Sequence, residues 1–186
     1  MTLALSTSTP FAAVALFDGA QLVTRNCKES RRAASSAIIE MRELLPTAEI
    51  SRIVVDVGPG SFTGVRVGVT MAKMWAEIEG LPLFGVESFD LFGSGPVAIP
   101  SKRGEVFLRI PGHPSQTIGV GEAEKIDGVK FVNEVEMNSI LTVLPLDRIF
   151  ESDPLGLMPS YVGEPNISVA KQAHIMGETF GGRGDV

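Results

Sequence analysis

A glycine-rich stretch decides the fold of this chain: it reads Val57-Gly58-Pro59-Gly60-Ser61-Phe62-Thr63-Gly64-Val65-Arg66-Val67-Gly68. The β-branched run at residues 52–57 predicts a buried strand before it, and residues 62–78 predict a helix after it. Two roles are open for four glycines at such a junction. They can expose backbone N–H groups to an anion at the helix N-terminus, or they can let the helix pack tightly on the sheet. From the pattern alone we favour tight packing.

Two familiar phosphate-binding loops do not match this stretch. The pattern G-x-x-x-x-G-K-[ST] has no counterpart in it. The dinucleotide pattern G-x-G-x-x-G is matched by Gly58 and Gly60, but its third glycine is replaced by Thr63. Neither class of nucleotide-binding protein is therefore indicated.

The segments around this stretch alternate between strand and helix patterns. A meander of three strands is predicted at residues 3–5, 11–17 and 21–26, and a helix runs from an N-cap at Ser30 to about Leu45. Further strands are predicted at residues 83–86, 96–99 and 105–110. This order predicts an α/β lobe with a mixed sheet over residues 1–110.

The pattern weakens after residue 110. Short strand-like runs at 117–120 and 128–132 alternate with Gly and Pro, and residues 138–144 fit a helix or a strand equally well. We therefore expect a smaller, irregular second lobe over residues 111–180 and a flexible tail over 181–186.

Composition and charge limit the functional classes. Apolar residues make up 44% of the 186 residues and charged residues 20%, which suits a packed soluble core. The net charge of −6 opposes an independent grip on nucleic acid. Cys27 is the only cysteine, and we find no signal peptide and no apolar stretch long enough to span a bilayer. These features predict a cytoplasmic protein.

As one string, G-P-G-S-F-T-G-x-R-x-G resembles the signature of the bacterial TsaB (YeaZ) family. Other pieces stand in the order of that family. Leu5-Ser6-Thr7-Ser8-Thr9 resembles its opening I-D-T-S-T, and Arg103-Gly104-Glu105-Val106-Phe107 resembles its strand R-R-G-E-V-Y. The strand Leu83-Phe84-Gly85-Val86 and the late Pro159-Ser160-Tyr161 also match. The resemblance covers residues 3–110 well and the remainder thinly. The signature residues are Gly58, Pro59, Gly60, Ser61, Phe62, Thr63, Gly64, Arg66 and Gly68.

The resemblance implies an ASKHA fold, the ribonuclease-H-like scaffold of actin, sugar kinases and the Hsp70 ATPase. It also implies a scaffold subunit that forms a homodimer and pairs with a TsaD-like catalytic subunit, which a TsaE-like ATPase joins. That complex transfers threonylcarbamoyl to N6 of adenosine 37 in tRNAs reading ANN codons. On this interpretation the chain meets tRNA only through the complex. ATP and metal are expected on partner subunits, and no cofactor is expected in this chain.

Several residues argue against a catalytic role for this chain. Ser6 stands where active members of the fold carry a magnesium-binding aspartate. The catalytic sibling has an H-x-x-x-H metal pair, whereas His113 and His174 are far apart here. The family's S-x-x-H-S beside the first helix lacks its histidine in residues 30–36, and residues 100–102 replace the aspartate before R-R-G-E. We therefore predict no catalytic and no metal-binding residue. Glu87, Asp90 and Glu105 are acidic residues that could meet at the sheet edge.

The helix at 62–78 has a narrow polar stripe with an apolar flank on each side, and the stripe is formed by Arg66, Thr70, Lys73 and Glu77. Either both flanks are buried inside the lobe, or one flank meets a second chain. The family uses its early helices for subunit contacts, which favours a partner. The predicted partner interface comprises Ala33, Ala37, Leu44, Val65, Val69, Ala72 and Ala76.

Two other functions compete with the scaffold role. One is a nucleotide- or anion-binding ASKHA-type enzyme, either a kinase or a peptidase-like protein, in which the loop from Gly58 to Gly64 holds phosphate. The other is a direct tRNA-binding module, which the acidic charge and the lack of a recognised RNA motif disfavour.

Overall fold

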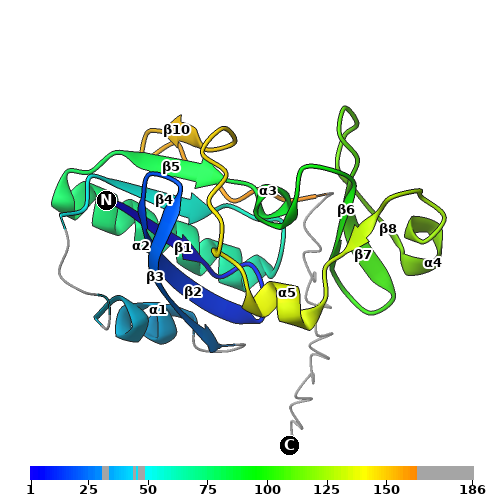
Figure 1. Ribbon diagram of the computed structural model, residues 1–186, viewed down its shortest axis with the longest axis horizontal. Helices are drawn as coiled ribbons and strands as arrows, with labels where there is room; N and C mark the ends of the chain where they lie inside the picture. The colour runs from blue at the N-terminus through cyan, green and yellow to red at the C-terminus, as the bar shows by residue number, and fades with distance from the viewer. Residues whose placement is uncertain (31–33, 44, 46–48, 163–186) are drawn as a thin grey trace, which may run out of the picture.

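The computed structural model describes residues 1–30, 34–43, 45 and 49–162 (Figure 1). The predicted tail, His174 and residues 163–180 of the predicted second lobe lie outside this part of the chain. None of the helices that it describes has both the length and the apolar character needed to cross a membrane.

The larger of two sheets is mixed, as predicted, and has six strands in the order β10-β5-β4-β1-β2-β3. Strands β1, β2 and β3 form the predicted antiparallel meander. On the other side of β1, β4 pairs with it in parallel, and β5 pairs in parallel with β4. The last strand, β10, returns antiparallel to β5 at the edge. The bounds are β1 Thr2–Ser6, β2 Phe11–Asp18, β3 Gln21–Glu29, β4 Arg52–Asp56, β5 Leu83–Val86 and β10 Phe150–Ser152.

Both faces of this sheet are covered, which explains the continuous apolar runs of its central strands. Helices α1 (Ala34–Glu43) and α2 (Phe62–Glu79) pack on one face (Figure 1). Leu3 and Leu5 of β1 belong to the apolar cluster on that face. Ala4 points to the opposite face, because side chains alternate along a strand. There it meets the core of α3 (Ser88–Phe92) and of the second sheet.

Helix α2 has the termini that its sequence predicts. The Ser61 hydroxyl accepts a hydrogen bond from the Gly64 N–H at 3.2 Å, which is an N-cap contact. Gly80 ends the helix with φ 63°, a left-handed conformation that glycine adopts without steric cost. The helix is therefore held at both ends by local contacts.

The second sheet has four strands in the order β8-β7-β6-β9. The strands predicted at 96–99 and 105–110 exist, but they belong to this sheet and not to the first one. By hydrogen bonding, β6 to β9 form the second sheet and β10 returns to the first. Our division into two lobes at residue 110 stays a prediction. The bounds are β6 Val97–Pro100, β7 Glu105–Arg109, β8 Gln116–Gly119, β9 Lys130–Phe131, α4 Val120–Ala123 and α5 Glu134–Asn138, and turns follow at 139–141.

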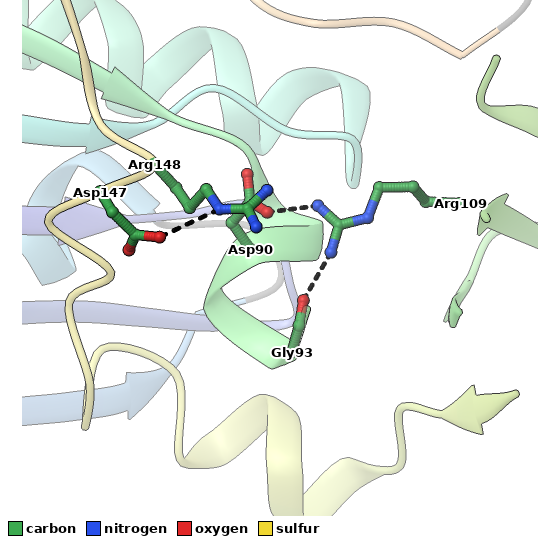
Figure 2. Close-up of polar contacts among 5 residues, drawn as sticks. All are labelled: Asp90, Gly93, Arg109, Asp147 and Arg148. Atoms are coloured by element: carbon green, nitrogen blue, oxygen red, sulfur yellow. Dashed lines mark hydrogen bonds and ion pairs between the residues drawn. The ribbon is translucent and has the colours of Figure 1, made fainter. Parts of the chain in front are cut away.

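Two cations of the second sheet hold it to the end of α3. Arg109 donates to the Asp90 carboxylate and to the Gly93 carbonyl, while Arg148 and Asp147 form a separate pair nearby (Figure 2). Lys130 donates to the Phe92 carbonyl at 2.7 Å. Cations are favourable at the C-terminal end of a helix, where free carbonyls carry partial negative charge. The second sheet is therefore fixed to the first through α3.

The two flanks of α2 differ sharply in exposure, since Val69 is 3% exposed and Ile78 is 73% exposed. Val69→Asp should lower the free energy of unfolding by at least about 3 kcal/mol, because it buries an unpaired charge. Ile78→Asp should change it by less than about 0.5 kcal/mol. Urea unfolding of both variants measures the difference, and equal losses would contradict this packing of α2.

Candidate functional site

The Asp56 carboxylate, which is fully buried at the end of β4, is the centre of a hydrogen-bonded network. Its Oδ2 accepts from the hydroxyls of Ser6 at 2.7 Å and Ser8 at 2.5 Å. Its Oδ1 accepts from the Ser88 hydroxyl at 2.6 Å and from the Gly58 N–H at 2.9 Å. The network joins the end of β1, the start of the glycine-rich loop and the first turn of α3.

Burial raises the pKa of Asp56 above its ordinary value, and the hydrogen bonds from the three serines and Gly58 oppose that rise. The network also explains why a serine suits position 6. An aspartate there would put a second carboxylate beside Asp56 in the same buried space, where like charges repel. Ser6 instead supplies a donor.

The glycines of the loop allow a close approach of backbone to backbone. A Cβ on Gly60 would lie 2.2 Å from the Ser8 carbonyl oxygen, and one on Gly64 would lie 2.0 Å from that of Thr7. Gly68 likewise faces the Thr7 hydroxyl, and that hydroxyl donates to the Gly64 carbonyl at 2.7 Å. These glycines thus pack α2 against the loop after β1, which is the role favoured from the sequence.

The same loop forms one wall of a cleft between the two sheets. A cavity of about 600 Å³ lies between residues 7–10, the start of α2 and the turn between β6 and β7. A neighbouring cavity of about 500 Å³ continues toward β8. Both are lined by Gly60, Phe62, Ser101, Lys102 and Phe107, so they form one cleft. A cleft of this size can hold a small molecule or part of a larger one.

The other signature residues take different positions around this cleft. Ser61 and Thr63 line the first cavity, and Pro59 lines the second. Arg66 lies over the Phe62 ring, 5.3 Å from its centroid. The Tyr161 ring also packs against the Phe62 ring, with centroids 5.1 Å apart. The signature therefore supplies both the packed base of the cleft and part of its rim.

Only two of the three acidic residues singled out in the sequence lie close together. Burial and the neighbouring Asp90 carboxylate raise the pKa of Glu87, and Arg109 opposes the rise. Glu105 instead pairs with Lys102 at 3.4 Å. In the described part of the chain, no group of three or more His, Cys, Asp and Glu residues could hold a metal ion.

Cys27 and His113 take no part in the cleft. The half-buried Cys27 thiol lies 3.3 Å from the Asn138 side-chain oxygen. Burial raises the pKa of this thiol and Arg25 opposes the rise, so the reactive thiolate is disfavoured. His113 is exposed on the turn after β7.

The structure corrects the predicted partner interface. Five of its residues are buried in the chain's own core against the larger sheet: Ala37, Val65, Val69, Ala72 and Ala76. The remaining two, Ala33 and Leu44, lie outside the described residues. Among the described residues of these helices, the exposed large apolar side chains are Phe62 at the start of α2, Met74 and Ile78 further along it, and Ile39 of α1. Helical spacing marks two flanks on α2, and only the position of the sheet decides which one is buried.

Sequence reasoning missed Asp56 and its donors Ser8 and Ser88. A signal was available, because Asp56 lies inside the apolar run 53–57 and a carboxylate buried in a strand is rarely without hydrogen-bond donors. The donors themselves lie 48 and 32 residues away along the chain, so no local pattern connects them.

Solved structures share this architecture. A Pseudomonas aeruginosa protein described as similar to peptidase YEAZ superposes with a TM-score of 0.55 at 22% identity, over 63% of this chain and 66% of that one. YeaZ from Pseudomonas aeruginosa gives a TM-score of 0.53 at 22% identity, over 63% and 67%. At this identity the likeness concerns the fold. The fold is thus of the ASKHA type.

The sequence model of a family described as "TsaD: tRNA N6-adenosine threonylcarbamoyltransferase" matches residues 30–123. The chain therefore belongs to this family, and within it to the TsaB (YeaZ) group. The tRNA threonylcarbamoyladenosine biosynthesis protein TsaB of Bacillus subtilis is 50% identical over 42 residues, which are 23% of this chain and 18% of that protein. An uncharacterized Mycobacterium leprae protein is 33% identical over 103 residues, 50% and 29% respectively. The chain thus spans less than a third of these curated relatives.

Adding a methyl group at Gly64 tests the packed base of the cleft. Gly64→Ala should lower the free energy of unfolding by about 3 kcal/mol, because its Cβ would overlap the Thr7 carbonyl. Gly121→Ala is the matched control, since a Cβ there meets nothing within 4 Å and replaces glycine in a helix. It should be neutral or stabilising by up to about 1 kcal/mol in urea unfolding. Similar losses in both variants would contradict the packing role.

The raised pKa of Asp56 predicts a pH dependence of stability. The folded chain keeps this proton to a higher pH than the unfolded chain, whose carboxyl has the ordinary value of 3.8. The stabilisation that the protonated Asp56 carboxyl gives the folded state is therefore fully present below pH 3.8. It is lost as the pH rises through the raised pKa of the folded chain. Relative to Asp56→Asn, the wild-type chain should lose stability with rising pH in urea titrations. Asp18→Asn is the exposed control. A wild-type chain that gained stability relative to Asp56→Asn as the pH rose would contradict the raised pKa.

Proposed function

We propose that the chain is a cytoplasmic, non-catalytic scaffold subunit of the complex that makes threonylcarbamoyladenosine on tRNA. That complex moves a threonylcarbamoyl group to N6 of adenosine 37 in tRNAs reading ANN codons. Membership of the TsaB group supports the pathway, and the exposed apolar flank of α2 supports the scaffold role. This flank comprises Met74, which is 56% exposed, and Ile78, with Ile39 of α1 exposed on the neighbouring helix.

The polar groups at the carboxyl ends of the strands support an accessory role. In an enzyme of this fold, carboxylates at this edge would face substrate and magnesium. Here both oxygens of Asp56 accept hydrogen bonds from the chain itself, and the hydroxyls of Ser6 and Ser8 are used as their donors. The network is directed inward and stabilises the fold.

The apolar flank of α2 suits association with another helical surface. Apolar side chains left exposed on a helix gain free energy when a partner removes them from water. A homodimer would cover the flank in the isolated chain, and a TsaD-like catalytic subunit would replace the second copy. A TsaE-like ATPase completes the complex and supplies ATP chemistry, so this chain needs no cofactor of its own.

Size exclusion with light scattering tests this assignment. The wild-type chain should form a dimer alone and a mixed complex with the TsaD-like subunit of the same genome. Ile78→Asp and Met74→Asp should each weaken the mixed complex by about tenfold or more, because they place a charge in an apolar contact. Val135→Asp, on the exposed face of α5, should leave it unchanged. A monomeric chain that ignores the catalytic subunit would refute the scaffold role.

A further inference from the structure

Two aromatic rings at the rim of the cleft stay open to solvent although they pack on each other. Phe62 begins α2, and Tyr161 follows the loop after β10; their ring planes are tilted by 31°. Phe62 is 49% exposed and Tyr161 is 43% exposed. Mutual packing thus covers only part of the two rings. A third ring, that of Phe107 on β7, lines the same cavity.

Cationic and donor groups surround these rings. The Arg66 guanidinium covers one side of Phe62, and Lys102 from the β6–β7 turn lines both cavities. The first backbone N–H groups of α2, those of Phe62 and Thr63, have no acceptor inside the helix. These groups favour an anion close to the rings.

The acidic groups of the cleft lie beside these cations. Glu105 pairs with Lys102 at 3.4 Å, and both residues keep much of their side chain exposed, so the pair is weak and can be exchanged for a ligand contact. Glu122 lines the second cavity near β8. Among the described residues that line the two cavities, Lys102 is thus the one cation and Glu105 and Glu122 are the acidic groups, while Arg66 lies beside the rim over the Phe62 ring.

An open ring next to a cation fits a nucleotide, because a base stacks on the ring and its phosphate contacts the cation. We propose that this rim binds an unpaired nucleotide of an RNA strand, with the base on the Tyr161 ring and the phosphate near Lys102 and the first turn of α2. The choice of RNA rests on the proposed function, and it departs from the expectation that the chain meets tRNA only through the complex. The net charge of −6 opposes binding spread over the whole surface, so the proposed contact is confined to this rim. A strand suits the site better than a free nucleotide, since the two cavities are continuous and the rings are half exposed, so neighbouring nucleotides can extend along the cleft.

Fluorescence anisotropy of a labelled short single-stranded RNA, titrated at low salt with the full chain, tests this proposal. Tyr161→Ala should weaken binding by about tenfold or more, and Tyr161→Phe should keep it within about twofold, because the ring is retained. Lys102→Ala should weaken binding and reduce its dependence on salt. Unlabelled RNA of the same sequence should compete, whereas its duplex and AMP at equal nucleotide concentration should not.

Three results would overturn the proposal. They are a wild-type chain that binds no single-stranded RNA, a Tyr161→Ala variant that binds as the wild type does, and AMP that competes as well as the RNA. The last result would assign the cleft to a free nucleotide. Urea unfolding of Tyr161→Ala and Tyr161→Phe separates lost stacking from lost folding, and Lys102→Ala changes only an exposed turn and so provides a second test.

The same proteins should be mixed with the TsaD-like subunit, because that separates this proposal from the scaffold role. Tyr161→Ala should leave the mixed complex intact, since Tyr161 packs on Phe62 at the first residue of α2, whereas Met74 and Ile78 lie in the last third of that helix. A wild-type chain that assembles but binds no RNA overturns the RNA site alone. A chain that binds RNA through Tyr161 but does not assemble overturns the scaffold role alone.

Discussion

The buried carboxylate of Asp56 is the constraint on which the rest of the structure depends. Moving a carboxylate out of water is costly unless donors replace the water, and here three serine hydroxyls and one backbone N–H do so. The donors come from the loop after β1, the loop after β4 and the start of α3. One side chain therefore holds together segments that lie far apart in the sequence.

The two walls of the cleft are both positioned by this arrangement. On one side, the Ser8 carbonyl accepts from the Ser61 N–H at 2.7 Å, which seats α2 against the loop that Asp56 holds. On the other side, α3 begins at Ser88, a donor to Asp56. It ends where Lys130 contacts the Phe92 carbonyl and where Arg109 contacts the Gly93 carbonyl, the latter drawn in Figure 2. Helix α3 thus connects the buried carboxylate to the second sheet, which forms the opposite wall of the cleft.

The family signature and the Asp56 network both serve the internal packing of this chain. The glycines serve close packing, and the inward network leaves the strand ends without a free carboxylate at Asp56. What faces outward is the apolar flank of α2 and the aromatic rim formed by Phe62 and Tyr161. These are the two surfaces on which the proposed scaffold role and the proposed RNA contact rest.

Local patterns in the sequence determined the meander, the parallel strands, both ends of α2 and the packing role of its glycines, because short-range sterics and capping govern these features. Three decisions needed the tertiary structure. Strands β6 and β7 joined a second sheet because strand pairing is non-local. The two flanks of α2 are similar in sequence, but the sheet packs against only one of them. The Val69 flank is therefore buried and the Ile78 flank is exposed. Ser6, Ser8 and Ser88 met at Asp56 because neighbouring strands bring together residues that the chain keeps up to 50 positions apart.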